Sequence, residues 1–259
     1  EIYIKEQIDS IIKQTYTNWI LLVRDDDSND HTKKIIYDYA KKDSRIKIIE
    51  DSKGNLGFVK NFEELLKYST SDFLMFSDQD DVWFDNKIER LYERISRENE
   101  TKAVLVHCNS SICDSNLNVL KKKFIKSTKT KKINYFFNFV VQGSSTIINK
   151  KMKDTALPFS KEVYIHDRYL DLLSEFLGKK EFINEPLMYY RQHQNNQIGS
   201  RTDVVNKVLH KRYFDSRDRE LIIKLYENYQ KDMTQEKKYY IEKYLEITNT
   251  KINRLKRLY

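Results

Sequence analysis

The stretch that decides the fold reads Phe73-Leu74-Met75-Phe76-Ser77-Asp78-Gln79-Asp80-Asp81-Val82-Trp83. A short apolar run predicts a buried strand, and three carboxylates follow its end. Residues two apart in an extended chain project to the same side, so Asp78 and Asp80 can aim at one point while Asp81 faces elsewhere. Two carboxylates that close repel each other unless a cation lies between them, and their oxygens suit Mg²⁺ or Mn²⁺. The stretch therefore predicts a metal site for chemistry on a diphosphate, with a solvated acidic turn as the alternative.

Length and composition limit the class of protein. A chain of 259 residues is long enough for one large domain, with or without an appended C-terminal piece. Its two cysteines, Cys108 and Cys113, have no second pair at zinc-binding spacing, which favours a reduced intracellular chain. No run approaches the roughly 18 apolar residues of a membrane-spanning helix, and no signal peptide is visible. We therefore expect a soluble or peripheral cytoplasmic protein.

The chain carries a formal net charge of +8, from 47 basic and 39 acidic residues. The basic residues are dispersed and show no aromatic and basic pattern of a nucleic-acid module, so we predict no nucleic-acid partner. A basic C-terminus can meet the anionic inner face of the cell membrane. A solvated helical face accounts for it equally well. Its basic residues are Lys251, Arg254, Lys256 and Arg257.

Strands alternate with helices in the first hundred residues. The pattern predicts strands at 19–23, 46–49 and 73–76, and helices at 4–12, 31–42, 59–68 and 87–99. Such alternation is typical of parallel strands with helices on both faces, whose ligands bind beyond the carboxyl ends of the strands. Acidic clusters follow two of these ends, at 25–27 and 78–81.

The pattern changes after residue 103. We expect strands at 103–112, 140–148 and 181–190, with Pro186 marking an edge or irregular strand, and helices at 150–155 and 166–177. From about 203 the chain is charged and helical, with an apolar face. We therefore predict a domain over 1–200 and a helical extension over 201–259. The residues of that face are Leu221, Ile222, Leu225 and Tyr226.

Five stretches occur together in a specific order. They are Tyr3-Ile4-Lys5-Glu6-Gln7-Ile8-Asp9-Ser10-Ile11, Arg24-Asp25-Asp26-Asp27-Ser28, Gly54-Asn55-Leu56-Gly57, Ser77-Asp78-Gln79-Asp80-Asp81 and His166-Asp167-Arg168, the last followed by Tyr190-Arg191-Gln192-His193. On these stretches the chain resembles the family 2 glycosyltransferases, inverting enzymes that use nucleotide sugars, and among them bacterial rhamnosyltransferase-like members. The resemblance implies the GT-A fold, an α/β fold with a mixed sheet and helices on both faces. It also implies a first strand ahead of residue 1, which this sequence does not contain.

The resemblance assigns binding roles at one end of the strands. The nucleotide-sugar contacts it implies are Asp25, Asp26, Asn55, Asp78, Gln142, Gly143 and Arg191. It makes Asp80 the direct metal ligand, with Asp78 near the ribose or metal, and places His193 where an imidazole can reach the metal. Several of these residues have an alternative structural role: a turn before a helix for Asn55, packing at a strand edge for Gln142 and Gly143, and surface packing for His193.

The same resemblance makes Asp167 the general base, although His166 replaces the more usual acidic residue before it; helix capping is the alternative role for Asp167. The expected activity is metal-dependent transfer of a hexose, rhamnose being one candidate, with inversion. The donor would be a UDP- or dTDP-linked sugar, the cofactor Mn²⁺ or Mg²⁺, and the acceptor a glycan or lipid-linked glycan of the bacterial capsule, lipopolysaccharide or cell wall. A nucleotidyltransferase of similar fold and an inactive scaffold remain open alternatives.

Overall fold

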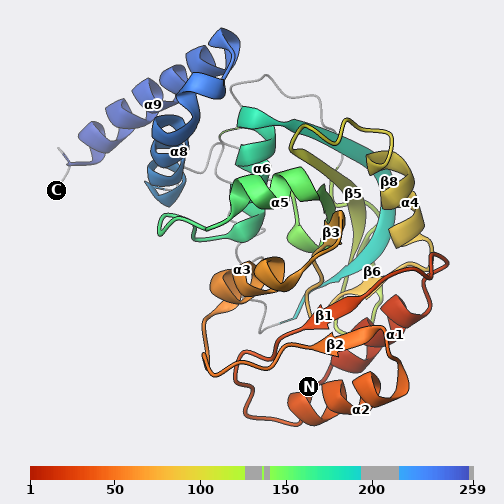
Figure 1. Ribbon diagram of the computed structural model, residues 1–259. Helices are drawn as coiled ribbons and strands as arrows, with labels where there is room; N and C mark the ends of the chain where they lie inside the picture. The colour runs from red at the N-terminus through yellow and green to blue at the C-terminus, as the bar shows by residue number, and fades with distance from the viewer. Residues whose placement is uncertain (126–135, 137–140, 194–215, 257–259) are drawn as a thin grey trace.

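One mixed sheet of six strands occupies the middle of the part of the chain described by the computed structural model, residues 1–125, 136, 141–193 and 216–256 (Figure 1). The strand order is β3-β7-β5-β8-β4, and β6 pairs with β5 at the side. The strand bounds are β3 Phe73–Met75, β4 Val82–Trp83, β5 Val104–Cys113, β6 Val119–Lys121, β7 Thr146–Asn149 and β8 Lys179–Arg191.

The directions of these strands correct one expectation. The N-terminal alternation predicted parallel strands, but β3 pairs antiparallel with β7, and β4 pairs antiparallel with β8. The long central strands β5 and β8 do run parallel, with a register shift where Asn109 faces Pro186. Pro186 thus marks an irregular stretch, because proline cannot donate to the strand ladder. The mixed sheet implied by the resemblance is confirmed.

Helices cover both faces of this sheet because apolar residues alternate along β5. Val104 and Val106 face α4 (Lys87–Ile95), where they pack with Leu91. Leu105 points the other way, into a larger core with Ile148. That core is covered by α5 (Lys150–Ala156) and α6 (His166–Leu177). The central layer is therefore buried on both sides.

A second, smaller sheet lies beside the first. Its strands, β1 (Leu21–Val23) and β2 (Ile46–Ile48), pair in parallel. They pack with α1 (Ile4–Ile12) and α2 (Thr32–Lys42) around an isoleucine cluster. The fully buried members of that cluster are Ile4, Ile8, Ile36 and Ile46.

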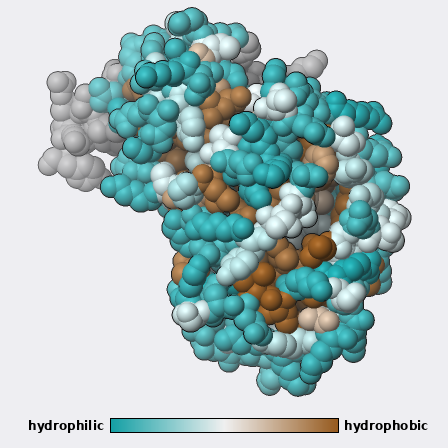
Figure 2. Space-filling view, viewed as in Figure 1, coloured by the Kyte–Doolittle hydropathy of each residue, from teal (hydrophilic) through white to brown (hydrophobic). Residues whose placement is uncertain are grey.

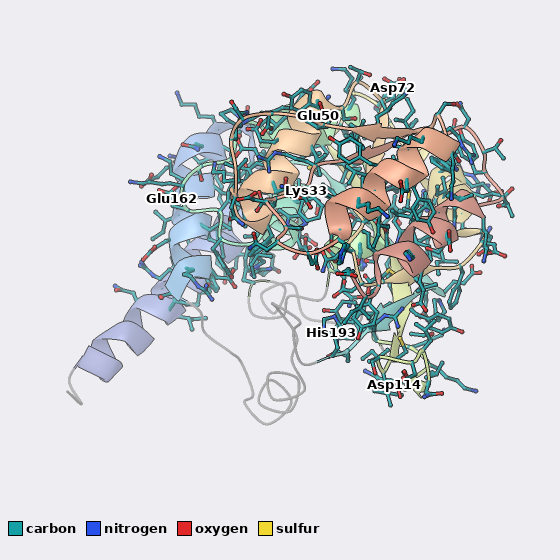
Figure 3. All side chains as sticks on the ribbon, turned by 90° about the horizontal axis from the view of Figure 1, so that it is seen from below. Lys33, Glu50, Asp72, Asp114, Glu162 and His193 are labelled. Carbon is teal, nitrogen blue, oxygen red and sulfur yellow. The ribbon has the colours of Figure 1, made fainter. Side chains whose placement is uncertain are left out.

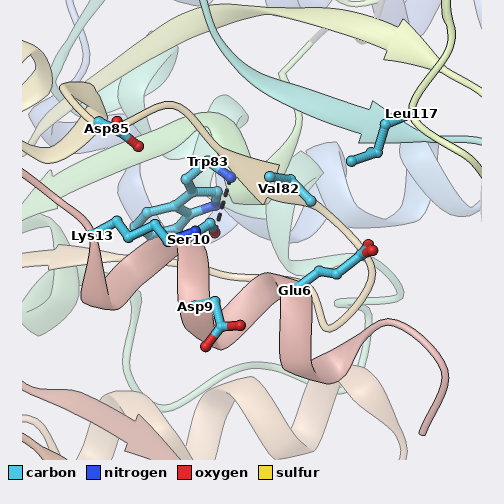
Figure 4. A pocket seen from close by; sticks show the side chains of 8 residues that line it. All are labelled: Glu6, Asp9, Ser10, Lys13, Val82, Trp83, Asp85 and Leu117. Atoms are coloured by element: carbon cyan, nitrogen blue, oxygen red, sulfur yellow. Dashed lines mark hydrogen bonds between the residues drawn. The ribbon is translucent and has the colours of Figure 1, made fainter.

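Helix α1 connects the two sheets. The amide of Trp83 in β4 donates to Ser10 Oγ at 3.0 Å, beside a pocket of about 250 Å³ between the helix and the strand (Figure 4). Gln14 donates to the carbonyl of Phe84 at 2.7 Å, and Gln7 donates to Ser77 Oγ at 2.5 Å. Polar side chains on one face of α1 thereby fix the segment that carries the carboxylates.

The predicted C-terminal helices are present as α8 (Ser216–Tyr229) and α9 (Gln235–Lys256), joined by the 3₁₀ turn η3 (Gln230–Asp232). The apolar residues Leu221, Ile222 and Leu225 are buried in the same core as α6. No helix in the described ranges combines the length and apolar content needed to cross a bilayer. The division at residue 200 and the side chains of Lys251, Arg254, Lys256 and Arg257 lie outside what the structure describes.

A cleft of about 1090 Å³, lined by both apolar and polar residues, lies between the two sheets. It is lined by β1, by β3 and by α3 (Phe58–Tyr68), and Figure 2 shows hydrophobic residues gathered in this hollow. The amide of Leu21 donates to the carbonyl of Arg45, on the side of β1 that faces β2. Successive residues of a strand alternate in direction, so the backbone N–H and C=O of Leu22 point to the opposite edge of β1. Leu21, Leu22 and Val23 line the cleft along this side of β1.

We predict that an apolar strand of about six residues, joined to Glu1, will pair in this cleft and raise the thermal unfolding midpoint by at least about 4 °C, because it buries side chains and satisfies edge amides. Scanning calorimetry of the extended and unextended chains measures the change. A matched extension with proline at its centre should give a smaller rise. Equal midpoints for all three chains would contradict the prediction.

Candidate active site

Three carboxylates cluster after β3, as the sequence predicted. Asp78 is half-buried, while Asp80 and Asp81 are 7% and 1% exposed. Burial, together with the charges of Asp167 and Asp80, raises the pKa of Asp78 to about 7. Burial and the neighbouring charges of Asp78 and Asp80 hold the pKa of Asp81 well above its usual value. The cluster is thus a concentration of negative charge that a cation would relieve.

Asp81 faces the protein interior, although a turn at 79–80 replaces the extended chain that the sequence predicted here. Its Oδ2 accepts a hydrogen bond from Ser144 Oγ at 2.7 Å, and its Oδ1 accepts one from the amide of Arg191 at 3.2 Å. Both donors come from segments far away in the sequence. Asp81 therefore anchors the acidic segment to the rest of the site.

The structure brings together two of the predicted metal ligands. His193, which follows β8 and is labelled in Figure 3, places Nε2 2.9 Å from Oδ2 of Asp80. Within the described ranges no group of three His, Cys, Asp or Glu residues is arranged to hold a metal ion. Mg²⁺ is usually held by one or two carboxylates together with substrate phosphates, so this donor set and the charge of Asp78 fit such an ion. The assignment of Asp78, Asp80 and His193 as ligands stays a prediction.

Arg191 is hydrogen-bonded through its side chain to the backbone of the acidic segment. Its side chain is 1% exposed and donates to the carbonyls of Asp80 at 2.7 Å and Ser115 at 2.5 Å, and it pairs with Glu6. The ring centre of Tyr3 lies 4.3 Å from the guanidinium carbon. In this structure the guanidinium binds protein groups, and its expected contact with a diphosphate stays a prediction.

Three of the predicted nucleotide-sugar residues, Asp25, Asp26 and Asn55, lie together after β1. Asp26 accepts hydrogen bonds from the amides of Leu56 and Gly57, both at 2.8 Å, and its carbonyl accepts one from Asn55 at 2.8 Å. Gly57 has a φ of 74°, which favours glycine. Asp25 accepts from the amide of Ser28 at 2.8 Å. Asp26 and Asn55 thus shape one loop beside Asp25, and base or ribose contact stays a prediction.

Sequence reasoning missed the centre of this loop, the buried guanidinium of Arg24. It makes two hydrogen bonds to Asp51, both at 2.9 Å, and others to Asp26, Asn61 and the carbonyl of Gly54. The hydrogen bonds from Arg24 lower the pKa of Asp51 to about 2. The arginine directly follows the apolar strand predicted at 19–23, and that position was the available signal.

Asp167 lies in the first turn of α6, and its Oδ2 accepts a hydrogen bond from the amide of Gly143 at 2.7 Å. Gly143 begins the 3₁₀ turn η2 (Gly143–Ser145), where an added Cβ would lie 2.2 Å from Asp167 Oδ1. Glycine is therefore required for the close approach of the two segments. Gln142 accepts from Ser110 Oγ at 2.6 Å. The structure thus brings Asp167 and Gly143 into direct contact, while Gln142 bonds β5.

A buried lysine supports the same turn. Lys87 is 0% exposed, donates to the carbonyl of Ser144 and lies 3.6 Å from the centre of the Trp83 ring. Burial lowers the pKa of Lys87 to about 7, although Asp81 and Asp78 oppose that shift. Nothing in the sequence distinguished it from a solvated lysine in the first turn of an amphipathic helix.

Comparison with known proteins identifies the class of protein. The family described as "Glycosyl transferase family 2" matches residues 1–154. A structure of Staphylococcus aureus TarS 1–349 with UDP-GlcNAc superposes with a TM-score of 0.64 at 17% identity, covering 95% of this chain and 68% of that one. The GT-A fold expected from the resemblance is confirmed. The chain belongs to glycosyl transferase family 2.

Two curated relatives extend this result. The dTDP-rhamnosyl transferase RfbG of Shigella flexneri is 29% identical over 216 residues, which are 77% of this chain and 72% of the relative. The WfgD protein of Escherichia coli, named as a UDP-Glc:alpha-D-GlcNAc-diphosphoundecaprenol beta-1,3-glucosyltransferase, is 46% identical over 88 residues. That match covers 33% of each chain.

We predict that Gly143→Ala will lower the rate of sugar transfer by about 100-fold, because the new Cβ displaces the carboxylate of Asp167, the predicted base, and small misplacements of a reacting group are that costly. Nucleotide affinity measured by calorimetry should change little. Ser145→Ala is the control, since it loses only a hydroxyl that donates to Gln142 O. Transfer at the original rate in Gly143→Ala would contradict the geometry.

We predict that Asp51→Asn will destabilise the fold at pH 7, because it leaves the buried Arg24 guanidinium with Asp26 as its one remaining carboxylate partner of the two that the structure describes. Because the pKa of Asp51 is lower in the folded protein, its carboxylate stabilises the fold at pH values above 3.8, the ordinary pKa. This contribution is lost as the pH falls toward about 2. Urea titrations of the wild type and of Asp51→Asn measure the free energy of unfolding of each. The difference between the two proteins should be equal at pH 7 and pH 5 and smaller at pH 3.5. A difference that stays constant at pH 3.5 would show that the charge of Asp51 is irrelevant.

Proposed function

We propose that this protein is a metal-dependent inverting glycosyltransferase. It moves a hexose from a UDP- or dTDP-linked donor to a hydroxyl of a lipid-linked bacterial surface glycan, at the cytoplasmic face of the membrane. The observation that carries the proposal is the shared turn η2, which bonds Asp167 through Gly143 and the acidic segment through Ser144. A base and a cation-binding cluster are thereby held at one site.

Relatives support the finer parts of the proposal. The dTDP-rhamnosyl name of RfbG favours a deoxyhexose donor, and the diphosphoundecaprenol in the name of WfgD favours a lipid-linked acceptor. A mannosyltransferase of Pyrobaculum calidifontis, solved "in complex with GDP-Man and Mn2+", superposes with a TM-score of 0.54 at 14% identity, covering 80% of this chain and 57% of that one. This neighbour supports Mn²⁺ as the cofactor.

Each residue has a part in the proposed reaction. The loop of Asp25, Asp26 and Asn55 receives the nucleoside, and Asp80 with His193 and Asp78 would hold the divalent ion. A bound divalent ion supplies charge neutralisation for the diphosphate leaving group. Asp167 takes the proton of the acceptor hydroxyl while that oxygen attacks the anomeric carbon opposite the leaving group. Attack from that face inverts the configuration.

We predict that Asp167→Asn and Asp80→Asn will each lower transfer by roughly 10²- to 10⁴-fold, the usual contribution of a general base or of a charge-stabilising group. Radiolabelled UDP- and dTDP-sugars with a lipid-linked acceptor measure the rate. Asp72→Asn is the control, because Asp72 is exposed at the start of β3. Full turnover in both variants would refute the residue assignments, and a wild-type chain that neither binds nor transfers any donor would favour the inactive scaffold.

A further inference from the structure

Three phenyl rings, which we call the aromatic box, pack around the imidazole of His166, the first residue of α6. They belong to Phe58, Phe62 and Phe76. The His166 side chain is 4% exposed, and its ring centre lies 4.2 Å from that of Phe62, 5.3 Å from that of Phe76 and 6.3 Å from that of Phe58. Two of these rings belong to α3 and the third follows β3. The imidazole is therefore fixed in position by residues far from it in sequence.

The fixed ring touches Asp167. Nε2 of His166 lies 2.6 Å from Oδ1 of Asp167. Both atoms are buried and neither makes a hydrogen bond within the described residues, so this close approach is the polar contact of each. The Asp167 side chain is 19% exposed, and because Oδ1 is buried, the exposed part of the side chain lies away from Oδ1. Oδ2 accepts the hydrogen bond from Gly143. The carboxylate thus accepts one hydrogen bond at Oδ2 and lies in close polar contact with the imidazole at Oδ1.

We propose that His166 is a positioning residue for Asp167, whose imidazole holds Oδ1 so that Oδ2 is presented to the acceptor hydroxyl. The proposal rests on the proposed function, in which Asp167 is the base. His166 does not touch the acceptor, because its ring is enclosed by the three phenyl rings. Its effect on the reaction passes through the carboxylate.

The electrostatics of the pair agree with this geometry. Burial disfavours the imidazolium, but the contact with Asp167 and the nearby charge of Asp78 outweigh burial, and the pKa of His166 is raised above its usual value. Both carboxylates favour the charged form of the ring. Removing the charge of Asp167 should therefore make His166 harder to protonate.

The first test is an NMR titration of the His166 imidazole in the full chain without added metal. The midpoint should fall by about one pH unit or more in Asp167→Asn, because the amide no longer offsets the cost of burying the cation. Asp154→Asn is the control, since Asp154 is exposed on α5 and pairs with Lys150. An unchanged midpoint in Asp167→Asn would overturn the coupling, whether or not the protein transfers sugar.

The second test separates positioning from packing. His166→Phe fills the box without a polar atom and should lower kcat by about 10- to 100-fold with the donor KM unchanged. His166→Gln offers an N–H to Oδ1 and should recover most of kcat. Wild-type kcat in His166→Phe would overturn the inference, whereas wild-type kcat in Asp167→Asn would overturn the proposed function instead. Thermal unfolding of each variant confirms that the comparison is between folded proteins.

Discussion

Repulsion among Asp78, Asp80 and Asp81 is the constraint on which the rest of the site depends. Three carboxylates so close to one another, two of them buried, are costly without compensating partners. The fold supplies the partners from distant segments: the hydroxyl of Ser144, the amide of Arg191 and the imidazole of His193. These partners do not offset all of the repulsion, because the pKa of Asp78 stays raised. We propose that a divalent cation bound with a diphosphate offsets the rest.

The turn η2 links Asp167 to this charge cluster. Gly143 carries the hydrogen bond to Asp167, and Ser144 carries the one to Asp81, so adjacent residues set the separation between Asp167 and the acidic segment. Lys87 donates to the carbonyl of Ser144 in the same turn from within the core. Because that turn leads directly into β7, the position of Asp167 depends on the central sheet.

Local pattern was sufficient to predict the helices, the end of β3 and the gathering of carboxylates there, since each depends on residues adjacent in the chain. It failed where distant segments decide the outcome. The direction of β3 is set by β7, more than seventy residues later, and the burial of Lys87 is set by Trp83, Ser144 and Met188 together. Arg191 was recognised as part of a motif, but its contacts with Glu6 and Ser115 depend on how β8 meets α1 and the loop before β6.

Calorimetric titration of the full chain with dTDP and UDP, each with and without Mn²⁺, tests most directly the claim that one site joins the nucleotide loop to the acidic cluster. The account predicts binding of one of them that strengthens at least about tenfold with Mn²⁺ in the wild type, a change of ~1.4 kcal/mol. In Asp80→Asn the dependence on Mn²⁺ should disappear while weak binding remains. Equal affinities with and without Mn²⁺ in both proteins would contradict the claim.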